Sequence, residues 1–256
     1  FTVFRGEGEG TCVTFRGTGP LGQLQVVADD AGWAKCYAGN PRADPPLRPD
    51  GKLDVGSAVG AGILSVVRSN KKLAEYTSDP YEGCTPIQTG EVGEDLAHYL
   101  AESEQVNSAL ALGVLIGKDA EVVAAGGYFL QILPFCSEET LSRLEAHLPS
   151  VPSVTSMFQG GSGVEEMAQQ IMGGFEYSLI GNLEPRYGPC EVEGEGGLRE
   201  RMQRAIALLG EEETRSIIQE QGHVEVTCEF CNEKLAFDEP AVTQALADLQ
   251  DRQYSP

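Results

Sequence analysis

Alternating apolar and polar positions predict that the first part of the chain is rich in β-strands. Residues 11–37 contain three short alternating runs separated by turn residues, and further apolar runs span 109–116 and 122–133. Such period-two runs between Gly, Asp and Pro clusters are typical of strands. Glycines alternate with apolar residues across 55–67, which favours a bent strand or a close approach of the backbone to another segment. Residues 78–90 are interpreted as a loop.

Helical spacing appears between and after these runs. Residues 91–105 repeat their apolar positions every three or four residues, and acidic residues in the first turn suit a helix N-terminus. Ser137 is a predicted N-cap for a helix that ends at Leu148. We expect further helical segments at residues 164–175, 198–209, 211–219 and 240–249.

One glycine pattern matches the loop that binds dinucleotides in other proteins. Residues 17–22 match GxGxxG, but a dinucleotide loop must open a helix after its last glycine. Here the chain continues as a strand, and Pro20 stiffens the turn. We therefore interpret the motif as a hairpin turn and expect no nucleotide cofactor.

A change of composition divides the chain. Residues 149–163 are rich in Pro, Ser and Gly and show little periodicity. We predict an α+β protein with an N-terminal α/β sheet domain over 1–150, a helical linker over 151–189 and a small C-terminal domain over 190–256. The C-terminal domain is expected to carry a β-hairpin with cysteines.

The predicted linker has an apolar surface of unusual composition. All four methionines of the chain lie in it or just after it, and methionine suits contacts that must repack. This surface either packs on the large domain or becomes available in another state, and the first does not exclude the second. Its members are Met157, Phe158, Met167, Ile171, Met172 and Phe175.

The cysteines carry the candidate chemistry. Cys228 and Cys231 lie at the tip of a predicted hairpin over 223–237, with Cys190 upstream. Two thiolates on such a tip are half of a tetrahedral metal site, and they are also close enough in sequence to form a disulfide. A strand follows Cys231 where a catalytic dithiol would have a helix, and nearby acids are expected to raise thiol pKa values. The remaining thiols are interpreted as core or inert loop residues: Cys12, Cys36, Cys84 and Cys136.

Charge and composition exclude several classes of function. The 256 residues carry a net charge of −21, which argues against binding to nucleic-acid phosphates. No apolar run approaches the length of a membrane span. Seven cysteines in a long chain do not resemble a secreted disulfide scaffold, so we expect a reducing compartment.

Several motifs together resemble the redox-regulated holdase chaperone family known as the thirty-three-kilodalton heat shock protein. The resemblance covers nearly the whole chain. The motifs are FRGTGPLG at 15–22, GEVGEDLAHYL at 90–100, SEQ at 103–105, AGGYFLQILP at 125–134, RER at 199–201 and the Cys228–Cys231 pair.

The resemblance implies that four cysteines, a CxC and a later CxxC, bind zinc when reduced. Oxidation then forms disulfides, releases zinc, unfolds the linker and exposes a surface for unfolding proteins, without ATP. This chain departs from the pattern because Cys190 is the only cysteine at the CxC position. Either zinc takes His223, Glu191 or Glu193 as a fourth ligand, or the site is a plain dithiol switch. We expect zinc to be sub-stoichiometric or easily chelated.

The sequence therefore predicts a holdase chaperone rather than an enzyme, with Cys190, Cys228 and Cys231 as the redox switch. The apolar linker surface is the predicted binding site for unfolded proteins, and a homodimer on oxidation is a further expectation. The alternative is a thiol-disulfide oxidoreductase that uses Cys228 and Cys231. We expect the Cys228–Cys231 disulfide to form first. The first residue is Phe, so we expect the natural N-terminus to be missing; the expected location is cytoplasmic, or a chloroplast after loss of a transit peptide.

Overall fold

The computed structural model describes residues 8–70, 80–119, 121–186, 190 and 197–254. The chain forms two compact units, residues 1–186 and 187–256, and each is described by itself. Both combine helices with antiparallel strands, which confirms the predicted α+β class.

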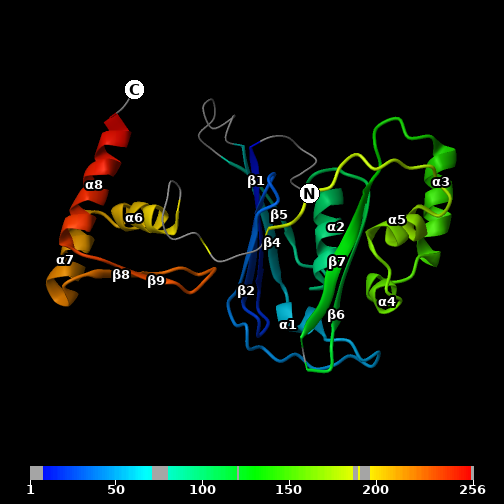
Figure 1. Ribbon diagram of the computed structural model, residues 1–256, viewed down its shortest axis with the longest axis horizontal. Helices are drawn as coiled ribbons and strands as arrows, with labels where there is room; N and C mark the ends of the chain where they lie inside the picture. The colour runs from blue at the N-terminus through cyan, green and yellow to red at the C-terminus, as the bar shows by residue number, and fades with distance from the viewer. Residues whose placement is uncertain (1–7, 71–79, 120, 187–189, 191–196, 255–256) are drawn as a thin grey trace. The chain divides into compact units, whose positions relative to one another are not determined.

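A five-stranded antiparallel sheet forms one layer of the first unit (Figure 1). Its order is β3-β2-β1-β4-β5. The β-branched alternation of β1 and β2 produces the pairing of Phe15 with Leu24 and Val13 with Val26. The glycine motif turns between these two strands, as predicted. The strands are β1 Glu9–Gly17, β2 Gln23–Asp29, β3 Ala34–Ala38, β4 Gly62–Asn70 and β5 Tyr81–Pro86.

Two sequence predictions in this region were wrong. The bent strand expected over 55–67 begins as a short helix, α1 Val55–Val59, because the Asp54 side chain accepts a hydrogen bond from Ser57 N at 3.0 Å and caps it. The alternative of a close backbone approach is confirmed, since a Cβ at Gly60 would lie 2.6 Å from Gly19 N. The helix ends at Gly60, whose φ of 73° suits glycine. The expected loop over 78–90 contains β5, an edge strand whose polar sequence conceals its pairing with β4.

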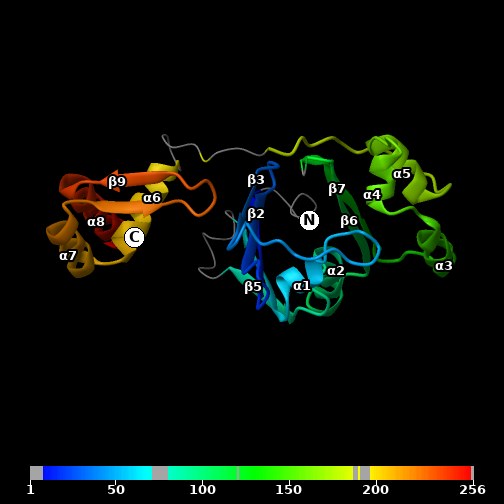
Figure 2. The same ribbon diagram turned by 90° about the horizontal axis from the view of Figure 1, so that it is seen from below.

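The central helix α2, Val92–Glu102, lies between the five-stranded sheet and a second, two-stranded sheet (Figures 1 and 2). That second sheet consists of β6 Ser108–Ile116 and β7 Val122–Gln131. The predicted helix and both strands are therefore confirmed. The core between these layers contains Phe15, Val59, Leu64, Val66, Ile87, Tyr99 and Leu100.

Tyr99, one of the core residues, is hydrogen-bonded to an ion pair. The Tyr99 hydroxyl donates to Glu104 Oε1 at 2.9 Å, and Arg68 pairs with the same oxygen at 2.9 Å. Burial and the hydrogen bond to Glu104 raise the pKa of Tyr99 from 10.0 to about 12. The folded state therefore favours the neutral phenol, whose contribution to stability is complete below pH 10.

The chain continues over the other face of the second sheet through α3 Glu138–His147, α4 Val154–Gln159 and α5 Val164–Met172. Ser137 caps α3, as predicted. Helix α4 was missed in a segment with little periodicity; Ser153 caps it by accepting from Ser156 N. Figure 2 shows α4 and α5 on the side of β6 and β7 away from α2.

The second unit contains three helices and the predicted hairpin in its described part. The helices after residue 197 begin and end close to the predicted positions, and Gly210 and Gly222 flank α7. Across the described residues, no helix has both the length and the apolarity that a membrane crossing requires. The elements are α6 Leu198–Leu208, α7 Glu211–Gln221, β8 Val224–Thr227, β9 Lys234–Phe237 and α8 Glu239–Tyr254.

We predict that Tyr99→Phe lowers the free energy of unfolding at pH 8 by roughly 1.5 kcal/mol, the lower range for a hydrogen bond to a charged group. Wild-type stability should fall as the pH rises from 10 to about 12, because the unfolded phenol loses its proton first. The variant should show a weaker decline. Denaturant unfolding at several pH values tests this, with the exposed Tyr177→Phe as control; equal slopes in all three proteins would contradict it.

Candidate thiol and metal centre

The hairpin of β8 and β9 positions two of the three candidate thiols. Val224 pairs with Phe237 at its open end and Thr227 with Lys234 next to its tip. At the tip, Cys228 N donates to Glu233 O and Asn232 N donates to Cys228 O, each at 2.8 Å. Asn232 has a φ of 58°, in the left-handed region that asparagine tolerates. This tight turn brings Cys231 back towards Cys228.

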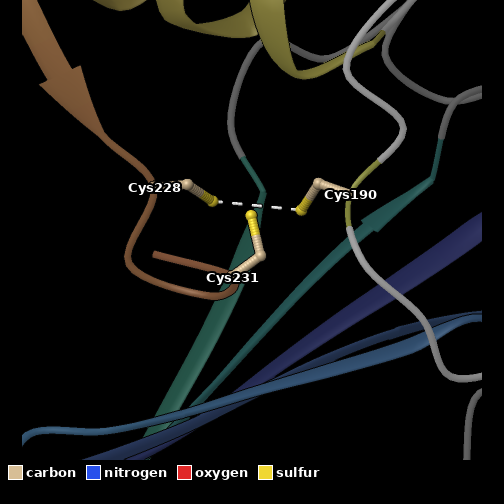
Figure 3. Close-up of side chains that lie close together, drawn as sticks. All are labelled: Cys190, Cys228 and Cys231. Atoms are coloured by element: carbon tan, nitrogen blue, oxygen red, sulfur yellow. Dashed lines mark hydrogen bonds between the residues drawn. The ribbon is translucent and has the colours of Figure 1, made fainter. Parts of the chain in front are cut away.

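The third thiol comes from 38 residues upstream. Cys190 Sγ lies 3.9 Å from Cys228 Sγ, and the sulfurs of Cys190, Cys228 and Cys231 all lie within 4.8 Å of one another. Figure 3 shows the three side chains converging on one point. With Zn–S bonds of about 2.3 Å, tetrahedral geometry separates two sulfurs by about 3.8 Å. The spacing therefore fits three ligands of a tetrahedral metal ion.

The cluster is part of the hydrophobic core of the second unit. Cys190 and Cys228 are only 4% and 7% exposed, while Cys231 is half-buried. The apolar side chains of the same core come from α6, the hairpin and α8: Leu198, Met202, Ile206, Val224, Leu235, Phe237 and Val242. Any change at the sulfurs therefore acts directly on the packing of this unit.

Burial raises the pKa of the Cys228 thiol, and backbone N–H donation from Cys231 and Phe230 to its sulfur opposes this only in part. The sequence argument expected a raised pKa from nearby acids. The direction is confirmed, but the main cause is burial, and Glu225 is paired with Lys234 at 2.8 Å. A catalytic dithiol needs a lowered thiol pKa and commonly a helix N-terminus, whereas a strand follows here.

The predicted fourth ligand His223 is not brought to the cluster. It precedes β8 at the open end of the hairpin, roughly 16 Å of extended chain from Cys228. Its ring is exposed, with Nδ1 3.1 Å from Gln221 O. Strand β8 separates His223 from the two cysteines at the tip, so the structure does not support His223 as the fourth ligand. Glu191 and Glu193 lie outside the described residues.

The remaining cysteines are dispersed over the first unit. Cys36, Cys84 and Cys136 are exposed, and Cys12 is half-buried beside Gln25, which donates to its sulfur at 3.1 Å. Three of these four cysteines are therefore not core residues. Within the described part of the chain, the Cys190 cluster is the only group of three potential metal ligands at such short range.

Comparison with known proteins identifies the family. The family described as Hsp33 protein matches residues 2–238 of this chain. The chain belongs to the Hsp33 family. This confirms the resemblance seen in the sequence motifs and supports a chaperone function, which favours a protein without catalytic activity.

Relatives of this Hsp33 chain are similar over most of their length. A 33 kDa chaperonin of Thermoanaerobacter sp. is 36% identical over 245 residues, covering 95% of this chain and 80% of the relative. One from Agathobacter rectalis is 38% identical over 220 residues, covering 86% and 73%. The crystal structure of the Thermotoga maritima 33 kDa chaperonin is similar with a TM-score of 0.74 and 29% identity, covering 98% of this chain and 81% of that one.

The predicted client-binding residues of this Hsp33 chain are mostly covered. Met157, Met167 and Ile171 are buried with Val154 against β6 and β7, and Phe158 packs beside them. A Cβ at Gly113 would lie 2.8 Å from Val154 Cβ, so the close approach of α4 requires glycine there. The Arg143 guanidinium lies 4.5 Å from the Phe175 ring centroid, and Met172 is half-buried. The structure thus has the packed arrangement that the sequence argument allowed.

Sequence reasoning missed an anchor for the C-terminal end of the linker. Arg186 pairs with the turn before β3: Arg186 N donates to Gly32 O at 2.8 Å, and Ala34 N donates to Arg186 O at 3.1 Å. The Arg186 guanidinium also lies 5.8 Å from the Trp33 ring centroid. No local pattern predicts this bridge, because Trp33 and Arg186 are far apart in the sequence. It holds the chain four residues before Cys190.

We predict that Cys190→Ser weakens zinc binding by more than about 100-fold, since even an outer-shell partner is worth about 10–100-fold. His223→Ala should bind zinc as the wild type does, because its ring is remote from the sulfurs. Competition with a chromophoric chelator on reduced protein measures both. A His223→Ala variant that loses zinc together with Cys190→Ser would contradict the assignment of ligands.

Proposed function

We propose that this chain is an ATP-independent holdase chaperone that thiol oxidation activates. It binds unfolding proteins and prevents their aggregation, and it works in a reducing compartment such as the cytoplasm. Family membership supports the chaperone part. The placement of Cys190 and Cys228 inside the hydrophobic core of the second unit is the observation that carries the redox part.

The reduced state is stabilised by this core. A unit of about 70 residues has a small apolar core, and such units commonly depend on a metal or disulfide for stability. A metal bound by the three thiolates ties Cys190 to the hairpin. Zinc is the proposed metal, since thiolates at this spacing suit it. When peroxide oxidises Cys228 and Cys231 to a disulfide and is itself reduced to water, that tie is lost, because the two sulfurs are no longer thiolate ligands that link Cys190 to the hairpin through the metal.

The effect passes to the linker along the chain. Arg186 is paired with the first unit, and Cys190 is packed in the second, so the chain is held at both ends of a four-residue interval. Release of Cys190 leaves Arg186 as the last anchor of the linker. Upstream of it, α4 and α5 have only six and nine residues, which is too short for stability without packing.

Partial release of α4 and α5 exposes an apolar surface. Met157, Met167 and Ile171 then lose their cover, and methionine side chains adapt to varied apolar partners. An exposed patch of this kind favours binding to unfolding chains. The net charge of −21 keeps the resulting complex from aggregating. The proposed client-binding surface therefore remains Met157, Phe158, Met167, Ile171, Met172 and Phe175.

We predict that peroxide-oxidised protein suppresses light scattering by a heat-unfolded client without ATP, and that reduced protein does so several-fold less. The buried thiols must change for the linker to be released. Cys228→Ser should change the ratio of client protection between oxidised and reduced protein. The matched variant Cys36→Ser, whose cysteine is exposed on β3, should keep the wild-type ratio. Client protection in neither redox state would remove the chaperone assignment, and thiol-dependent insulin reduction would favour the oxidoreductase alternative.

We also predict faster proteolysis between about residues 150 and 190 after oxidation, because release of the linker exposes its backbone. Trp33 is the only tryptophan and contacts Arg186, so its fluorescence should report the loss of this anchor. Arg186→Ala should shift the emission of reduced protein towards that of oxidised protein. Cleavage and emission that are the same in both redox states would leave a chaperone without this switch.

A further inference from the structure

The thiol cluster supplies three corners of a tetrahedron. Cys190 Sγ and Cys228 Sγ are 3.9 Å apart, close to the separation of about 3.8 Å that a shared zinc ion sets. The Cys231 sulfur lies within 4.8 Å of both. Among the His, Cys, Asp and Glu side chains that the structure describes, none adds a fourth donor at this range.

Burial indicates where the remaining corner lies. Cys190 and Cys228 are enclosed by the core, whereas Cys231 is half-buried at the hairpin tip. Its neighbours Glu229 and Asn232 are exposed. Because apolar side chains cover the inner sulfurs, access from solvent to a metal ion is through the tip beside Cys231.

We propose that the site binds one divalent cation of the zinc class through Cys190, Cys228 and Cys231 and leaves the fourth position to an exchangeable small ligand. Water occupies this position at rest, and a small nitrogen or thiol donor replaces it. Closed sites with four protein ligands are structural, whereas three protein ligands with one open position allow a small molecule to reach the metal.

Charge favours water over an anion at the open position. A divalent cation with three thiolates already carries a net charge of −1, and the hairpin tip adds the exposed Glu229 and Glu233. A second anion would therefore meet repulsion, whereas water and imidazole bring no charge. A thiol enters by releasing its proton to solvent and binding as a thiolate, so it meets this repulsion and replaces the water less readily than imidazole does. The stability of the metal site thus depends on the small ligands around it.

Cobalt(II) reports this coordination directly. Reduced full-length protein is loaded with one equivalent of Co²⁺ without oxygen, and its visible and sulfur-to-metal absorption bands are recorded. Imidazole and, in a second titration, 2-mercaptoethanol are then added. We expect each to shift the visible bands saturably with one ligand bound per metal, while circular dichroism shows an unchanged fold.

Two variants test whether the protein fills the position itself. Val192→Cys places a thiol two residues after Cys190, and we expect it to abolish the imidazole response and to tighten the metal by more than about tenfold. Glu191→Gln combined with Glu193→Gln should respond to imidazole as the wild type does. The proposal would be overturned if the wild-type spectrum changed with neither ligand. It would also be overturned if only the double variant responded to them.

Failure here is distinct from failure of the proposed function. The spectra require no client, so a protein without chaperone activity still tests the site. A protein that protects clients after oxidation but binds no cobalt through these thiols would overturn the open metal site alone.

Discussion

The second unit depends on the contact between Cys190 and the hairpin that carries Cys228 and Cys231. The two inner sulfurs lie 3.9 Å apart within a small apolar core. The thiols are therefore part of the apolar packing of this unit, and a chemical change at the sulfurs also changes that packing. In a unit of this size the loss of one tie is a large fraction of total stability. This coupling means that a change at the thiols also changes the packing of the second unit.

The first unit has a central core and a smaller core in its outer layer. The five-stranded sheet, α2 and the β6–β7 sheet share a core that contains Tyr99 and Leu100, and the Arg68–Glu104 pair closes it. Helices α4 and α5 share a smaller core with the outer face of β6 and β7. Short helices with few buried residues open at lower cost than central strands. The methionine surface lies in this outer layer.

The burial of Cys228 decides which thiol chemistry it suits. Burial raises its thiol pKa, and a strand follows the pair where a dithiol catalyst would have a helix. A neutral thiol in a core is slow to attack a disulfide but becomes a thiolate when a metal binds. The same side chain therefore suits metal binding better than catalysis. Its position beside half-buried Cys231 leaves one side of the site within reach of solvent.

The sequence by itself determined most strands, most helices, the cysteine hairpin and the family, because periodicity, caps and motifs are local signals. It missed α1, α4 and β5, whose short or polar sequences depend on neighbours for their structure. It also offered His223 as one of several fourth ligands, since closeness in sequence does not show that a strand separates the two ends of a hairpin. Only the tertiary structure brought Cys190 to the hairpin and Arg186 to Trp33, because contacts over 38 and about 150 residues have no local pattern.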